Sequence, residues 1–112
     1  MWVNLCIHDI VIVKSDTFKF VIAPSGVVAR VDTETVSLGE DDGIPITETI
    51  FKDVIGLPAP QEGTKYIVSK IVAERCADRT DVYFPNENIR NDQKKVIGSA
   101  SLTPSTVFKK NR

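Results

Sequence analysis

The sequence predicts a mainly β, α+β fold: a small antiparallel sheet or partly open barrel of about six strands with one short helix. Three observations support this. Apolar residues recur at every second position in several short segments, glycine and proline clusters separate those segments, and a single segment has helical spacing. A chain of 112 residues, 42% of them hydrophobic, has room for one core. We expect one β-rich domain over residues 1–102 and a flexible basic C-terminal tail over 103–112.

The first elements form a predicted β-hairpin. Residues 3–13 are rich in valine and isoleucine and predict one strand, or two short strands with a bend near Asp9. Residues 14–16 are a turn cluster, and apolar side chains then alternate along 18–22. Residues 24–26, Pro-Ser-Gly, end the second strand, because proline lacks a ladder donor and glycine accepts a positive φ.

A second hairpin is predicted over residues 27–55. Residues 27–38 alternate apolar side chains with threonines and acids, and 39–43, bracketed by glycines, form a five-residue loop. The returning strand covers 44–55, and its expected core positions are Ile46, Ile50 and Val54. Two prolines in 56–63 predict a loop.

The remaining elements are short. Residues 66–68 predict a strand, and the spacing that follows predicts a helix over about 69–78 with Ser69 as its N-cap. Residues 82–84 form a strand that Pro85 stops, and 96–102 form another.

The net charge of −1 hides an uneven distribution. Residues 1–63 carry a net −6 and residues 64–112 a net +5. Folding either mixes the two halves or produces a molecule with an acidic and a basic side, able to dock a partner or to self-associate. Nucleic acid is not expected as a partner, since the bulk charge is wrong for strong binding. No apolar run reaches the ~18 residues of a membrane span.

The cysteine and histidine content predicts no cofactor and no metal. Cys6 and Cys76 are seventy positions apart, and His8 is the only histidine, whereas a zinc site needs about four such ligands. Two reduced thiols and the absence of a signal-peptide pattern predict a cytoplasmic protein.

Catalytic motifs are absent from the sequence, so the protein is not expected to be an enzyme. There is no nucleophile elbow and no phosphate-binding glycine loop. His8 is read either as a strand histidine bonded to a backbone carbonyl, or as a ligand-binding group or general base.

Residues 79–92 form an unusual segment with two arginines around a short aromatic strand. These arginines either pair internally, Arg79 with Asp78 or Asp81 and Arg90 with Asp92, or line a pocket for an anionic ligand or an acidic protein. Arg30 could join that pocket from the sheet. The candidate ligand- or partner-binding residues are His8, Ser25, Arg30, Arg79, Asp81 and Arg90.

Several short motifs occur in a fixed order between residues 4 and 102. They are Asn4-Leu5…His8, Pro24-Ser25-Gly26…Ala29-Arg30-Val31, Gly43-Ile44-Pro45, Gly56-Leu57-Pro58, Tyr66-Ile67-Val68-Ser69, Arg79…Asp81…Pro85 and Arg90…Ile97-Gly98. In these motifs the chain resembles a family of short uncharacterised proteins from bacteriophages, prophages and bacterial genomes. It departs from the pattern at Cys6-Ile7, where Thr-Pro is expected, and at Ser99, where cysteine is expected.

The resemblance implies a phage or prophage context rather than a reaction. Small accessory proteins of this kind act by binding, so we expect an anti-defence factor that sequesters an anionic small molecule or blocks a host protein in the host cytoplasm. The alternatives are a structural or assembly β-domain of a phage particle, forming a homo-oligomer, and a small enzyme dependent on His8.

Overall fold

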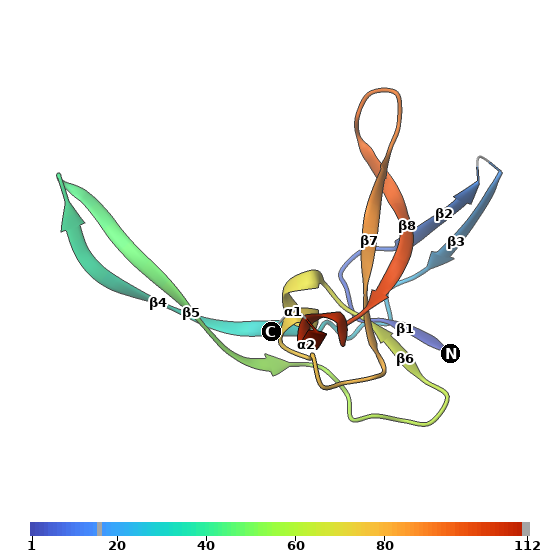
Figure 1. Ribbon diagram of the computed structural model, residues 1–112, viewed down its shortest axis with the longest axis horizontal. Helices are drawn as coiled ribbons and strands as arrows, with labels where there is room; N and C mark the ends of the chain where they lie inside the picture. The colour runs from blue at the N-terminus through green and yellow to red at the C-terminus, as the bar shows by residue number, and fades with distance from the viewer. Residues whose placement is uncertain (16, 111–112) are drawn as a thin grey trace.

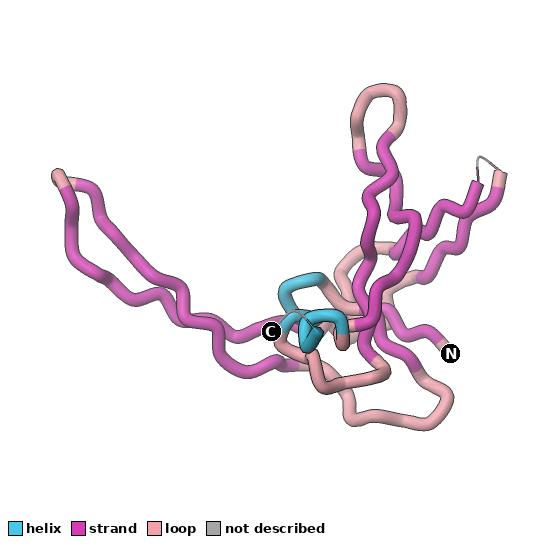
Figure 2. The backbone as a smooth tube through the Cα atoms, in the orientation of Figure 1, coloured by secondary structure: helices cyan, strands magenta, loops and turns pink. Residues whose placement is uncertain are grey.

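The computed structural model describes residues 1–15 and 17–110 and divides them between a six-stranded sheet and a projecting two-stranded hairpin (Figure 1). The sheet order is β1 (Trp2–Asn4), β6 (Lys65–Ile67), β7 (Val82–Arg90), β8 (Val96–Pro104), β2 (Ile10–Ser15) and β3 (Phe18–Ile22). The hairpin consists of β4 (Arg30–Asp41) and β5 (Ile44–Ile55). There are two short helices (Figure 2): α1 (Lys70–Glu74) contacts β4 and β7, and α2 (Val107–Lys110) contacts β7 through the ring of Phe108.

The six-stranded sheet is mixed and nearly closed into a partly open barrel. The β2–β3 and β7–β8 pairs are antiparallel hairpins, whereas β1–β6, β6–β7 and β2–β8 are parallel. The predicted mainly β fold and partly open barrel are therefore confirmed, whereas the prediction that the sheet is antiparallel throughout is wrong. Long connections cause the difference, because they bring a strand back in the same direction beside a strand that is distant in the sequence.

Asn4 draws the two ends of the sheet together. Its backbone forms a parallel bridge with Pro24, just beyond β3, and its carbonyl accepts a hydrogen bond from the Ser25 amide at 3.0 Å. The side-chain Nδ2 donates to the carbonyl oxygens of Ile22 and His8, both at 2.9 Å. Its Oδ1 accepts from the Cys6 amide at 2.8 Å. This fully buried amide thus bonds both edges of the barrel.

The hydrophobic core lies on the outer face of β6 and β7, beneath α1. Alternation along these strands directs Tyr66, Val82 and Phe84 into it, and α1 adds Val72 and Ala73. The predicted helix over 69–78 is shorter than expected. Its regular part ends at Glu74, and Ser69 occupies the N-cap position without a side-chain capping bond.

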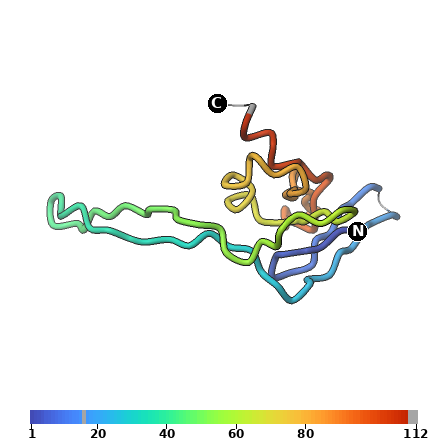
Figure 3. The backbone as a smooth tube through the Cα atoms, turned by 90° about the horizontal axis from the view of Figure 1, so that it is seen from below, coloured from blue at the N-terminus to red at the C-terminus, as the bar shows by residue number. Residues whose placement is uncertain are grey.

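The β4–β5 hairpin, called the arm below, extends away from the rest of the molecule (Figure 3). Its turn has two residues rather than the predicted five, because Asp42 and Gly43 both adopt positive φ, as a tight hairpin turn requires. Val54 packs on the core at the arm's base, as predicted. Ile46 and Ile50 are 39% and 41% exposed, so their predicted core positions are wrong.

Gly56 anchors the arm to the body. Its φ is +86°, and a Cβ built there would lie 2.3 Å from the carbonyl oxygen of Val28. The close passage of the two backbones at the base of the arm therefore requires glycine at this position.

The C-terminal segment packs on the core, which corrects the prediction of a flexible tail over 103–112 for its described part. β8 runs to Pro104, and the buried Ser105 hydroxyl donates to the carbonyl oxygens of Cys76 and Arg79 at 2.8 and 2.9 Å. The ring of Phe108 stacks on Phe84 at 5.3 Å between centroids. Residues 111–112 lie outside the described residues.

β7 also continues beyond its predicted end. Pro85 lies within the strand, opposite Leu102 of β8, instead of stopping it. The backbone nitrogen of Pro85 faces the β6 side of β7, and β6 pairs with β7 only up to Tyr83. No neighbouring strand therefore needs the N–H that proline lacks.

Candidate functional site

The mouth of the barrel is an apolar cavity of about 480 Å³ to which every strand of the six-stranded sheet contributes. The lining residues are Trp2, Ile12, Phe20, Val21, Ile22, Lys65, Tyr83 and Leu102. Barrel mouths are frequent small-molecule sites, because strands around the ring direct their inward side chains to one place. The backbone ladder therefore assembles this cavity from segments far apart in the sequence.

An aromatic pair and a lysine form one wall of the mouth. The rings of Trp2 and Tyr83 meet edge to face, with centroids 5.1 Å apart and planes at 76°. The Lys65 ammonium lies 5.2 Å from the Trp2 ring centroid and 5.9 Å from that of Tyr83. The parallel register produces this arrangement, since Trp2 pairs with Lys65, and Ile67, two residues further along β6 and on the same face, pairs with Tyr83.

A second ammonium group lies close to the mouth. Lys14 Nζ is 5.8 Å from the ring centroid of Phe20, a lining residue. Neither Lys14 nor Lys65 takes part in the ion pairs found among the described residues. The mouth therefore combines an apolar aromatic surface with positive charge that no carboxylate of those residues neutralises at ion-pair distance.

These features suit a flat ring that carries a negative charge. A planar ring stacks on or against the exposed faces and edges of Trp2 and Tyr83. A phosphate, sulfate or carboxylate then meets the Lys65 ammonium, which presents up to three donors on a flexible stem. Nothing in the lining supplies a carboxylate, imidazole or thiol.

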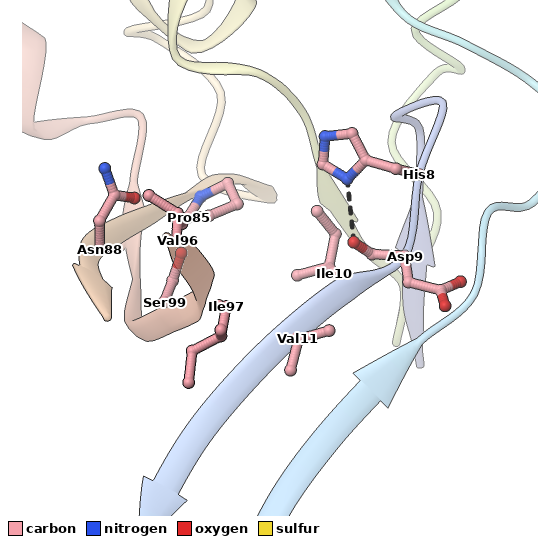
Figure 4. Close-up of a pocket in the computed structure, with 10 residues that line it drawn as sticks. His8, Asp9, Ile10, Val11, Pro85, Asn88, Val96, Ile97 and Ser99 are labelled. Carbon is pink, nitrogen blue, oxygen red and sulfur yellow. Dashed lines mark hydrogen bonds between the residues drawn. The ribbon is translucent and has the colours of Figure 1, made fainter. Parts of the chain in front are cut away.

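His8 lies at a different opening, between the start of β2 and the β7–β8 hairpin (Figure 4). This cavity has a volume of about 370 Å³ and also includes Asn88 and Ser99. The Nδ1 of His8 donates to the backbone carbonyl oxygen of Asp9 at 2.9 Å, which leaves the Nε2 of His8 for a ligand. None of the other five residues selected from the sequence lines this cavity. A role for His8 stays a prediction.

Arg79 and Asp81 form an internal pair. Arg79 Nε and Nη2 donate to the two carboxylate oxygens of Asp81, each at 2.8 Å, and Nη2 also donates to the carbonyl oxygen of Pro58 at 3.0 Å. The hydrogen bonds from the guanidinium lower the pKa of the Asp81 carboxyl. The bond to the carboxylate likewise raises the pKa of Arg79. Both groups thus hold the loop before β7 in place.

The other selected residues lie on separate elements. Arg90 ends β7 and donates to the carbonyl oxygen of Lys94 at 2.9 Å across the hairpin tip. Ser25 forms a local turn in which its hydroxyl bonds the backbone of Val27 at 3.3 Å. Arg30 is the exposed first residue of β4. The three arginines therefore do not converge on one pocket.

The thiols are poor candidates for chemistry. Burial raises the pKa of Cys6, and burial is also the main reason that the pKa of Cys76 is raised. Both cysteines are free, and a thiol held in its protonated form is a weak nucleophile.

Sequence reasoning did not select Trp2, Lys65 or Tyr83 as a site. Tyr66, Tyr83 and Phe84 have similar chemistry in the sequence, and strand register alone decides that Tyr66 and Phe84 enter the core whereas Tyr83 faces the mouth. No local signal marks these three residues as neighbours, because only the pairing of β1, β6 and β7 brings them together.

Comparisons with known proteins do not assign a family. No protein-family model, curated protein or solved structure matches the chain. In residues 1–15 and 17–110, no three histidine, cysteine, aspartate or glutamate side chains gather as a metal site. No helix in that part of the chain has the length and apolar character needed to cross a membrane.

Proposed function

We propose that the protein is a non-enzymatic binding protein that holds a small planar aromatic anion in the mouth of its barrel. The observation that carries the proposal is the convergence of all six strands on one apolar cavity walled by Trp2, Tyr83 and Lys65. The absence of a carboxylate, imidazole or thiol from its lining supports capture of a ligand rather than its conversion. Such capture is how a phage accessory protein would sequester an anionic signal molecule.

The expected affinity follows from ligand size. Drug-sized ligands gain about 0.3 kcal/mol per non-hydrogen atom, so AMP, with about 23 such atoms, should bind with a free energy of roughly −7 kcal/mol and a Kd of about 10 µM. Adenosine offers the same ring without the charge, and inorganic phosphate offers the charge without the ring. The site as described requires both parts.

Trp2 provides the assay, because it is the single tryptophan of the chain and it lines the mouth. AMP should quench or shift its fluorescence in a saturable manner, with adenosine and phosphate each binding at least about tenfold more weakly. Equal responses to AMP and adenosine would show that the ligand needs no negative charge. No response to AMP up to about 1 mM, a binding free energy of roughly −4 kcal/mol, would overturn the proposed site.

Two lysine variants separate the site from general charge effects. Lys65→Gln should weaken AMP binding about 5- to 10-fold, since one charged hydrogen bond at an exposed site contributes roughly 1–1.4 kcal/mol. Lys52→Gln is the matched control, because Lys52 pairs with Glu34 on the arm at 3.0 Å and does not line the mouth. An equal loss in the two variants would contradict a specific contact with Lys65.

A further inference from the structure

The mouth of the barrel carries the same side-chain arrangement on two walls. The first wall, on β1, β6 and β7, consists of an edge-to-face aromatic pair and the Lys65 ammonium. On the second wall, formed by β2 and β3, the rings of Phe18 and Phe20 also meet edge to face, with centroids 5.1 Å apart and planes at 89°. The Lys14 ammonium lies 5.8 Å from the Phe20 centroid. Each wall therefore combines two aromatic rings with one ammonium group.

The second wall belongs to the same cavity as the first. Ile12 of β2 pairs with Phe20 of β3, and both line the mouth. Phe18 and Phe20 are 50% and 49% exposed, so about half of each residue's surface stays free for a ligand. Among the described residues, no ring of one wall stacks on a ring of the other. The cavity thus keeps two separate aromatic surfaces apart.

A single planar ring is too thin to cover both walls. A cavity of about 480 Å³ is about 10 Å across if it is treated as a sphere, whereas one stacked ring occupies a layer of about 3.5–4 Å. A ring placed against Trp2 therefore leaves Phe20 in contact with water. A ligand with a ring for each wall removes the most apolar surface from water.

The two ammonium groups are held loosely. The distances from Lys14 to the Phe20 centroid, 5.8 Å, and from Lys65 to the Tyr83 centroid, 5.9 Å, are close to the limit of about 6 Å for a cation–π contact. Both lysines have flexible stems, so each ammonium can turn from its ring towards an anion. The mouth therefore offers one positive charge for each aromatic wall.

We infer that the mouth binds a dinucleotide, meaning two nucleobase rings joined by a bridge that carries two phosphates. One ring lies against each wall, and the phosphates lie between Lys14 and Lys65. The inference rests on the proposed function, because the dinucleotide fills the same mouth and extends the one-ring ligand by a second ring and a second anion. Once the first ring is bound, the second binds as part of the same molecule, so the joined ligand exceeds either half in affinity.

Calorimetric titration of the whole chain separates the contribution of rings from that of charges. ADP has one ring and two phosphates, and ApA has two rings and one phosphate. Diadenosine diphosphate and pApA both have two rings and two phosphates and differ in how their halves are joined. The tighter of these two should bind with one molecule per chain, at least about tenfold more tightly than ADP or ApA, because base stacking adds to affinity for each ring.

The titration distinguishes failure of this inference from failure of the proposed function. If AMP binds but neither two-ring, two-phosphate ligand binds more tightly than ADP, the dinucleotide is refuted and the one-ring site stands. If none of these ligands binds up to about 1 mM, both are refuted. A tetranucleotide of adenosine should bind about as tightly as pApA, since the mouth has only two aromatic walls. An affinity that keeps rising with length would identify single-stranded nucleic acid as the ligand instead.

A phenylalanine variant tests the second ring position. Phe20→Leu keeps an apolar side chain but removes the ring, so it should weaken the tighter dinucleotide about tenfold more than it weakens ADP. Phe51→Leu is the matched control, because Phe51 is an exposed phenylalanine on the arm that also lies near a cation, with Arg75 Cζ 4.8 Å from its ring centroid. It does not line the mouth, so both affinities should stay within about twofold of the wild type. Equal losses for ADP and the dinucleotide in Phe20→Leu would refute the second ring position.

A lysine variant tests the second anion. Lys14→Gln should weaken the tighter dinucleotide about 5- to 10-fold, as should Lys65→Gln, since each ammonium meets one phosphate. Lys19→Gln is the control, because Lys19 lies on β3 beside Phe20 but does not line the mouth. A single cooperative thermal transition in each variant shows that the barrel still folds. If Lys14→Gln binds the dinucleotide as tightly as the wild type while Lys65→Gln does not, the mouth holds one anion and the inference is overturned.

Discussion

Replacing Asn4 with alanine should be the most informative single test of the barrel. Asn4 is 1% exposed, and its amide makes three hydrogen bonds of 2.8–2.9 Å that join β1 to β3 and to the following loop. Each such bond contributes about 1 kcal/mol net, so Asn4→Ala should reduce the free energy of unfolding by about 3 kcal/mol. At about 4 °C per kcal/mol for a domain of this size, Tm should fall by roughly 12 °C.

The matched control is Asn86, an exposed asparagine on β7. Its Nδ2 donates one bond of 3.1 Å to Thr103 Oγ1 at the surface, where water can replace the lost partner. Asn86→Ala should therefore change the free energy of unfolding by no more than about 0.5 kcal/mol. Urea unfolding followed by Trp2 fluorescence measures both variants, because Trp2 is two residues from Asn4 on the same strand.

A second substitution at Asn4 separates hydrogen bonding from loss of volume. Asn4→Asp keeps the shape and the acceptor for the Cys6 amide but replaces the donor to Ile22 and His8 with a second oxygen. At neutral pH it should be at least as damaging as Asn4→Ala, because a buried carboxylate oxygen then faces carbonyl oxygens. If Asn4→Ala lowers the free energy of unfolding by less than about 0.5 kcal/mol, closure of the barrel by this amide is refuted.

Two further predictions concern the base of the arm and the loop before β7. Gly56→Ala should lower the free energy of unfolding by more than about 2 kcal/mol. Gly26→Ala is the control, because Gly26 has a similar φ of +96° but open space around it, and it should lower the free energy of unfolding by about 1 kcal/mol. Equal losses for the two variants in urea unfolding would contradict the close backbone contact at Gly56. The pKa of Asp81 is lowered by its hydrogen bonds to Arg79, so its contribution to stability is present above the unfolded pKa of about 3.9 and is lost as pH falls through the lower folded value. Asp81→Asn should lower the free energy of unfolding at pH 7 by about 1–2 kcal/mol and make that free energy fall less steeply below pH ~5. Asp78→Asn, at an exposed pair with Lys109, should leave the stability at pH 7 and its acid dependence nearly unchanged. If the stability of Asp81→Asn falls with pH as steeply as that of the wild type, the role given to the Arg79–Asp81 pair is refuted.

Local patterns predicted the strands well because each depends on neighbouring residues. Alternation along 18–22 and 44–55, and the glycines near the arm's turn, predicted both hairpins. The same alternation was misleading for Ile46 and Ile50. Periodicity shows that a strand has an apolar face but not what covers it, and on the arm no element of the described chain does so.

The candidate site was less predictable than the fold. The residues selected from the sequence were notable for charge, yet Arg79 and Asp81 satisfy each other and Arg90 bonds its own hairpin. Trp2 and Lys65 lie sixty-three positions apart, and only parallel pairing of two three-residue strands brings them together. Such pairing leaves no mark in the local composition of either segment.

By itself, the sequence determined a mainly β domain, its hairpins and its uneven charge, because strand propensity, turn chemistry and charge are properties of neighbouring residues. Tertiary structure alone decided three things: the closure of the sheet by Asn4, the convergence of six strands on an aromatic mouth, and the separation of the acidic segment as a projecting arm. Each depends on which strands become neighbours and in what register, and contacts between residues far apart in the chain set both.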